Sequence, residues 1–184
     1  MKKMSNKTYL PTVDVALTAV FVAVFAVLNL ALGPLSFQLL QLPILHDFAA
    51  FCPLLLVTWA TGRFGTSLLV GVTGSMVAIL LGGPPLIICF AASAVIFDSL
   101  MSANHHKIRV SIYSLTVAAI ATIVSAYLTG VFVGAFFTPN QTLQWSLTFW
   151  GGWHLVGGIM TVAVTLPTIL ALEKANVRKI KGDR

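Results

Sequence analysis

Charged residues are scarce in this sequence. Only 9% of its 184 residues are Asp, Glu, Lys or Arg, and 58% are hydrophobic, whereas soluble domains carry about 25% charged residues. No formal charge occurs between Asp14 and Asp47, or between Arg109 and Glu173. So few charges cannot cover the surface of a water-soluble globule. This scarcity excludes a soluble protein and predicts an integral membrane protein that crosses the bilayer several times.

Several other features are missing, and each excludes a class of site. The two cysteines, Cys52 and Cys89, lie in apolar stretches, so a structural disulfide is not expected. No Gly-x-x-x-x-Gly-Lys-Ser/Thr loop is present, which excludes ATP hydrolysis by that machinery. The adjacent His105 and His106 lack a third nearby ligand, so no metal site is predicted.

Six apolar segments make up most of the chain, and turn signals such as Gly33-Pro34 and Gly82-Gly83-Pro84-Pro85 separate them. About 20 apolar residues are needed to span a bilayer as a helix. We interpret residues 33–45 as an apolar loop that dips into the membrane. The sequence thus predicts one all-α membrane domain over residues 1–184, a bundle of six transmembrane helices at about 13–32, 46–60, 66–81, 86–101, 111–137 and 147–172.

The cations show which side of the membrane each loop occupies. Three of the eleven Lys and Arg residues precede the first segment, Arg63 lies in the second loop, Lys107 and Arg109 lie in the fourth, and five follow the last segment. The loops at about 33–45, 82–85 and 138–146 contain none. Cytoplasmic loops of membrane proteins are enriched in Lys and Arg. This layout predicts cytoplasmic N and C termini, and it explains the net charge of +6 without a nucleic-acid partner.

Polar and aromatic residues from separate segments meet at the predicted outer depth of the bundle. Polar side chains at membrane depth are costly and are candidate functional groups by default. An acid, two imidazoles, amides and tryptophans suit a small polar ligand with a planar ring, since the acid can pair with a cationic or N–H-bearing edge and a tryptophan can stack. The predicted substrate-binding residues are Asn29, Gln41, His46, Asp47, Trp150, Trp153 and His154.

Each of these residues also has a purely structural interpretation. Tryptophans near a membrane surface commonly act as interfacial anchors. Asp47 can cap the start of its helix, and His154 can be an interhelical hydrogen-bonding residue. No catalytic set and no covalently bound cofactor are predicted.

Small residues recur on the first, third and fifth predicted helices. Such residues allow helices to approach closely in lipid. On the third and fifth helices they are expected to pack within the bundle. On the first helix, Ala19 and Ala23 lie in the cytoplasmic half, where they can pack within the bundle or receive a partner subunit.

Several local motifs accompany the six predicted spans. They are the apolar loop before the second helix, Ala19-x-x-x-Ala23, Pro53-Leu54-Leu55-Leu56, Gly62-Arg63-Phe64-Gly65, the small-residue run at 70–74 and the run at 154–161. Together with the length of the chain, these features resemble the substrate-binding S component of energy-coupling factor (ECF) vitamin transporters, closest in pattern to the thiamin-type members.

The resemblance implies a multi-pass protein of the prokaryotic plasma membrane that binds a vitamin or vitamin precursor from outside. It implies docking through Ala19 and Ala23 on a transmembrane coupling (T) subunit, which two cytoplasmic ATPase subunits drive. Thiamin-binding members commonly carry an Asn where His154 stands, so the vitamin stays open. The Met-His N-terminus of the nickel and cobalt members is absent, because the chain begins Met1-Lys2.

Two alternatives remain. One is a stand-alone small-molecule transporter or membrane subunit without an ATPase partner. The other is a rhomboid-like intramembrane protease, since His154-x-x-Gly157 is similar to the histidine helix of that family and Ser75 follows a glycine. Met76 breaks the expected Gly-x-Ser-Gly motif, and a serine nucleophile also needs a base within hydrogen-bond reach.

Overall fold

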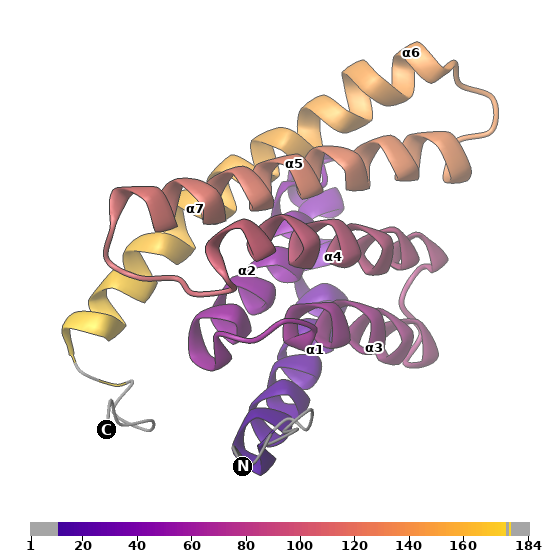
Figure 1. Cartoon of the computed structure of the whole chain (residues 1–184). Helices are drawn as coiled ribbons and strands as arrows, with labels where there is room; N and C mark the ends of the chain where they lie inside the picture. Colours follow the sequence, from indigo (N-terminus) through magenta and orange to yellow (C-terminus); the bar gives the residue numbers. More distant parts are fainter. Residues whose placement is uncertain (1–10, 176, 178–184) are drawn as a thin grey trace, which may run out of the picture.

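The computed structural model describes residues 11–175 and residue 177, and every regular element over these residues is helical (Figure 1). The cations of residues 1–10 and 178–184, and Met1, lie outside this part of the chain. Three short helices, η1 (Pro85–Ile87), η2 (Ser102–Asn104) and the π-helix η3 (Ser146–Trp150), accompany the α-helices. The α-helices are α1 (Thr12–Leu40), α2 (Ile44–Thr61), α3 (Thr66–Leu80), α4 (Ile88–Met101), α5 (Ile112–Phe137), α6 (Leu143–Trp145) and α7 (Gly151–Lys174).

Five helical stretches of the described chain are long and apolar enough to cross a membrane. They cover residues 12–40, 44–61, 85–104, 112–137 and 143–174. Helix α3 is apolar but has only 15 residues, which corresponds to about 22 Å at 1.5 Å per residue. The structure therefore confirms an all-α chain of membrane character, while the count of six spans depends on α3 and stays a prediction.

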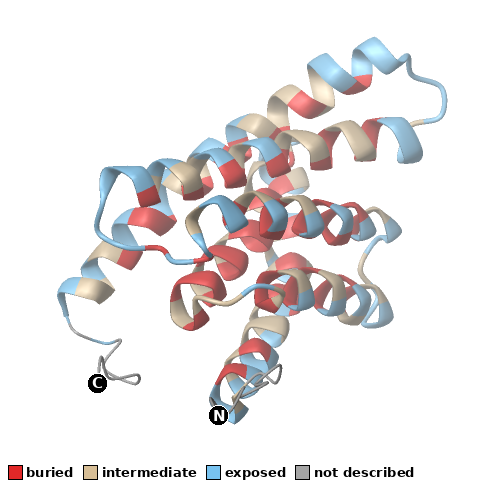
Figure 2. Cartoon of the chain, in the orientation of Figure 1, coloured by how far each residue is buried: buried red, intermediate tan, exposed pale blue. Residues whose placement is uncertain are grey.

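The helices form a closed ring of contacts that includes α2. Helix α1 contacts α2 and α3, α3 contacts α4, α4 contacts α5, α5 contacts α7, and α7 returns to α2. Among the five long stretches, α2 has the largest buried share. Figure 2 shows buried residues gathered on the sides of the helices that face one another, with exposed residues along the outward sides. The core of the ring includes Phe25, Phe51, Leu54, Leu55, Phe90 and Phe97.

Small residues set the closest helix contacts, as lipid-embedded bundles require. A Cβ atom added at Gly71 of α3 would overlap Ala94 of α4, and one at Gly158 of α7 would overlap Ala126 of α5. These contacts confirm the predicted packing role of the small residues on α3 and α5. Cys52 and Cys89 are both free thiols.

Helix α1 differs from the sequence prediction, because it continues through Pro34 to Leu40 instead of ending near Leu32. A proline inside a helix removes one backbone hydrogen bond and strains the turn before it. However, unwinding residues 33–40 in an apolar phase would leave many more backbone groups unsatisfied. The end of α1 is also tied to α2, since Ser36 Oγ donates to Leu42 O (2.5 Å) and accepts from Leu45 N (3.1 Å). Only residues 41–43 connect the two helices.

Candidate functional site

A pocket of about 410 Å³ opens between α1, α2, the turn before α4, the end of α5 and η3. This volume lies in the range of about 300–1,000 Å³ that is typical of small-molecule sites. We call it the His46 pocket. Its described lining consists of Asn29, Gly33, Pro34, Phe37, His46, Pro84, Leu86, Val133, Phe137, Thr138 and Trp150.

His46 is the titratable residue among those that line the pocket, and it is 1% exposed. Its ring packs beside Phe90 at 4.9 Å and edge-on to Phe37 at 6.5 Å. Gly33 of α1 faces the ring directly, since a Cβ atom at this position would lie 3.3 Å from His46 Nε2. The absence of a side chain at Gly33 therefore lets α1 pass close to the imidazole.

Three lining residues carry buried polar atoms for which the described chain supplies no hydrogen-bond partner. These atoms are Asn29 Oδ1, both ring nitrogens of His46, and Trp150 Nε1. The Asn29 amide is held in place because its Nδ2 donates to Phe25 O at 2.8 Å. A buried polar atom without a partner costs about 1–3 kcal/mol, and native proteins leave few of them. Several such atoms on one pocket indicate a site that a polar ligand completes.

Asp47 and His154 form a buried pair that joins α2 to α7. His154 Nδ1 lies 2.8 Å from Asp47 Oδ1, and the two residues are 1% and 0% exposed. A carboxylate accepts, so the imidazole nitrogen is the donor. Any side chain at Gly157 would overlap the Asp47 carboxylate. This pair does not line the pocket. Asp47 Oδ1 is engaged with His154, whereas Asp47 Oδ2 is buried without a hydrogen-bond partner in the described chain.

Aromatic rings connect the pair to the pocket. The His154 ring lies 6.1 Å from Phe90 and 6.4 Å from Trp150, and Phe90 in turn contacts His46. The Asp47–His154 pair therefore contacts the pocket indirectly, through the rings of Phe90 and Trp150.

Close packing of α5 against η3 positions Trp150. A Cβ atom at Gly130 would overlap the Trp150 carbonyl oxygen, and one at Gly134 would overlap Ser146. The π-helix η3 ends at Trp150, and isolated π-helical turns are frequent at functional sites. The wall residues Val133, Phe137 and Thr138 were not predicted from the sequence. The four-residue spacing of Gly130 and Gly134 is the signal that could have indicated this approach.

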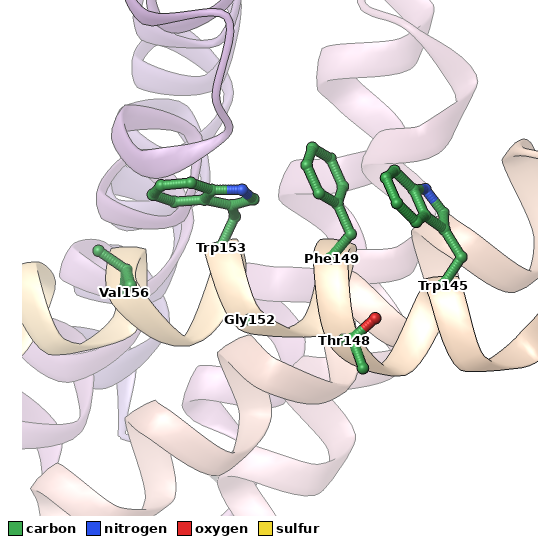
Figure 3. A pocket seen from close by; sticks show the side chains of 6 residues that line it. All are labelled: Trp145, Thr148, Phe149, Gly152, Trp153 and Val156. Atoms are coloured by element: carbon green, nitrogen blue, oxygen red, sulfur yellow. The ribbon is translucent and has the colours of Figure 1, made fainter.

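Two predicted site residues lie elsewhere. Gln41 ends α1 in the left-handed conformation (φ 54°) and is exposed. Trp153 lies with Trp145 and Phe149 on a shallow surface along α6, η3 and α7, and Figure 3 shows their rings projecting from one side of the helix. Trp145 and Phe149 stack at 4.5 Å. The structure therefore separates Trp153 from Trp150, which lines the His46 pocket.

The opposite end of the bundle, which we call the Arg63 end, has a different polar arrangement. Arg63 Nε lies 2.5 Å from Asp14 Oδ2, and Trp59 Nε1 donates to Glu173 Oε1 at 2.9 Å. Asp98 accepts from Gly65 N at 3.0 Å and from Ser67 Oγ. The carboxylates at this end are each bonded to groups on a neighbouring helix or turn.

Two further predictions concern the docking residues Ala19 and Ala23 on α1 and the adjacent histidines His105 and His106. Ala19 and Ala23 are both exposed on α1. His106 is buried, with Nε2 lying 2.9 Å from Asp98 O, whereas His105 is exposed. No group of three potential metal ligands occurs within the described residues.

No protein-family model, curated protein or solved structure matches this chain. The functional conclusion therefore depends on its own residues and on the geometry described above.

Proposed function

We propose that this chain is a membrane-embedded binding subunit for the uptake of a vitamin or vitamin precursor with a planar ring. In this proposal it delivers the ligand to an ATP-driven coupling module, as an S component of an ECF transporter does. One observation carries the proposal: the His46 pocket presents the buried, unpartnered polar atoms of Asn29, His46 and Trp150. Aromatic and apolar walls with a few placed polar groups are the usual composition of a small-molecule site.

Binding fits this site better than catalysis. Ser75 Oγ has no hydrogen-bond partner within the described chain, and His154 Nδ1 is engaged with Asp47. The protease interpretation thus lacks the hydrogen-bonded nucleophile and base that it requires. Thr138 supplies the hydroxyl among the described lining residues of the pocket. This hydroxyl donates to Gly134 O, so it is not hydrogen-bonded to a base that could activate it.

The proposal includes six spans with both termini in the cytoplasm. Arg63 and the loop that carries Lys107 and Arg109 lie at the end of the bundle opposite the pocket, and no Lys or Arg occurs at 33–45, 82–85 or 138–146. The positive-inside rule then directs the His46 pocket toward the outside. Helix α3 crosses as a short span beside α1 and α4.

Delivery requires contact with other subunits. The chain has no ATP-binding loop of its own, so the proposal assigns ATP hydrolysis to two cytoplasmic ATPase subunits. Ala19 and Ala23 are exposed on α1 near Val20, which is 58% exposed. This surface is the proposed contact with the transmembrane coupling subunit.

The decisive experiment identifies what the purified protein retains. The chain is purified in detergent without ATP, and bound small molecules are extracted and identified by mass spectrometry. We expect one ring compound at about one molecule per chain, and tight rebinding measured by calorimetry. The Ser75→Ala variant should bind normally. It also removes a buried hydroxyl that has no partner among residues 11–175 and 177, but this hydroxyl lies outside the pocket. A protein that retains no ring compound and binds none of a panel of vitamins and precursors would refute the proposal.

A second measurement tests the coupling partner. Ala19→Leu combined with Ala23→Leu should leave ligand binding intact but abolish uptake and co-purification with ATPase subunits. The control replaces the exposed alanines Ala92 and Ala163 of α4 and α7 by leucine. Normal ATPase association of the Ala19/Ala23 variant would contradict the docking surface. Uptake by the chain alone in proteoliposomes would instead support a stand-alone transporter.

A further inference from the structure

The charge of the ligand can be inferred from the residues that surround the His46 pocket, provided that the proposed binding function holds. None of the described residues that line the pocket is Asp, Glu, Lys or Arg. Asp47 is the acid that directly follows the lining residue His46 in the chain. It is fully buried, does not line the pocket and is bonded to His154. The pocket therefore offers neither a carboxylate for a cation nor a cation for an anion.

An ionic ligand would enter this pocket at a high energetic cost. Removing an ion from water costs several kcal/mol unless an opposite charge compensates it. The rings of Phe37, Phe137 and Trp150 line the pocket, but attraction between a cation and a ring contributes only about 0.5–2 kcal/mol. An anion would find a single N–H donor on Trp150 and at most one on a neutral His46. An uncharged ligand avoids this cost.

The unpartnered atoms specify what the ligand must carry in place of charge. Asn29 Oδ1 can only accept a hydrogen bond, and Trp150 Nε1 can only donate one. In its neutral form, the imidazole of His46 has one donor and one acceptor nitrogen. The pocket thus presents hydrogen-bond donors and acceptors in equal number, beside aromatic and apolar side chains.

From this combination we infer that the His46 pocket takes an uncharged, planar nitrogen heterocycle whose edge carries both hydrogen-bond donors and acceptors. Amino- and amide-substituted rings have this character. Ring carboxylates and quaternary ring cations do not. The Asp47–His154 pair holds the surrounding rings and makes no contact with the ligand.

The test compares ligands that share a ring and differ in charge. The molecule retained by the purified protein is identified first, and its charge at pH 7 is noted. Calorimetry then measures nicotinamide, nicotinate and 1-methylnicotinamide, and a matching set of 4-aminopyrimidine, its N-methyl cation and a pyrimidine carboxylate. We expect an uncharged retained molecule, and within each set that binds we expect the uncharged compound to bind at least tenfold tighter than either ion.

The outcomes separate this inference from the proposed function. A charged retained molecule, or an ion that binds within tenfold of its uncharged counterpart, overturns the ligand class and leaves the binding function intact. A protein that retains nothing and binds no compound of either set or of the vitamin panel overturns both.

A variant provides an independent test of the same inference. Asn29→Asp places a carboxylate at the pocket with little change in shape. The Asn29→Asp substitution should raise the affinity for the N-methyl ring cation, relative to that for its uncharged parent ring, by at least tenfold. Ser125→Ala, which removes a buried hydroxyl outside the pocket, should leave the preference unchanged. Should Asn29→Asp fail to fold, as judged by thermal unfolding, Val133→Asp at the α5 wall provides the same test. An unchanged preference in a folded variant counts against the inference.

Discussion

The two ends of this bundle use similar polar residues in opposite ways. At the Arg63 end, Asp98 accepts from Gly65 and Ser67, and Asp14 pairs with Arg63. At the other end, Asn29, His46 and Trp150 keep buried polar atoms without partners in the described chain. Polar groups that bond one another stabilise the fold, whereas polar groups left open at a pocket reduce stability and are available to a ligand. The difference teaches that the gathering of several unpartnered polar atoms around one pocket distinguishes the candidate binding site from the structural cluster at the Arg63 end.

The Asp47–His154 pair differs from the pocket residues, because His154 Nδ1 is bonded to Asp47 Oδ1, and breaking it should have the largest effect. His154→Leu leaves the Asp47 carboxylate buried without its donor, and the removal of one partner of a buried pair costs about 3–5 kcal/mol. Thermal unfolding in detergent should show a large loss of stability together with loss of ligand binding. His154→Asn keeps an N–H donor and should retain most of the stability. Equal stability of the leucine and asparagine variants would contradict the role of the pair.

Replacing His46 should separate binding from stability. The His46 ring nitrogens have no partner within the described residues to lose, so His46→Leu should unfold at the same or a higher temperature than the parent. Ligand affinity should fall about 10- to 100-fold, since hydrogen bonds of this kind contribute about 0.5–1.5 kcal/mol each and an unpaired ligand group adds a further penalty. Calorimetry and thermal unfolding on the same preparation measure both effects. His46→Gln, which keeps a donor and an acceptor, should retain more affinity than His46→Leu.

The Arg63 end should show the reverse pattern. Ser67→Ala removes one hydrogen bond to the Asp98 carboxylate, and bonds to charged groups contribute about 1.5–3 kcal/mol. Stability should therefore fall while ligand affinity stays unchanged. Loss of affinity in a folded Ser67→Ala protein would show that the two ends are coupled, and the comparison drawn above would fail.

The smallest effect is expected where α1 meets α2. Ser36→Ala removes the two hydrogen bonds that tie the end of α1 to Leu42 and Leu45, at a cost of about 1 kcal/mol. Because Phe37 follows Ser36 and lines the pocket, ligand dissociation should become a few-fold faster. Stopped-flow release of the bound ligand measures this change. Ser99→Ala, on an exposed serine of α4, is the matched control and should release the ligand at the parental rate.

Part of the lining of the candidate site could be predicted from the sequence, because a polar residue in an apolar helix is conspicuous. Asn29, His46 and Trp150 were identified in this way, and the structure places all three on one pocket. Asp47 and His154 were also identified, but their contact with each other was not, because 107 residues separate them in the chain. Apolar wall residues such as Val133 and Phe137 resemble every other apolar residue of a membrane helix, so the sequence carries no signal for them.

The scarcity of charge and the apolar runs of about 20 residues by themselves determined that the chain is an all-α protein of membrane character, because a helix of that length spans lipid with its backbone groups bonded internally. The positions of the polar residues along the predicted helices also indicated that Asn29, His46 and Trp150 lie at the same end of the bundle. Only the tertiary structure decided which way each side chain points. His46 and Asp47 are neighbours on α2, and successive residues of a helix point about 100° apart. One of them therefore reaches the pocket while the other reaches α7, and the packing of the surrounding helices determines which.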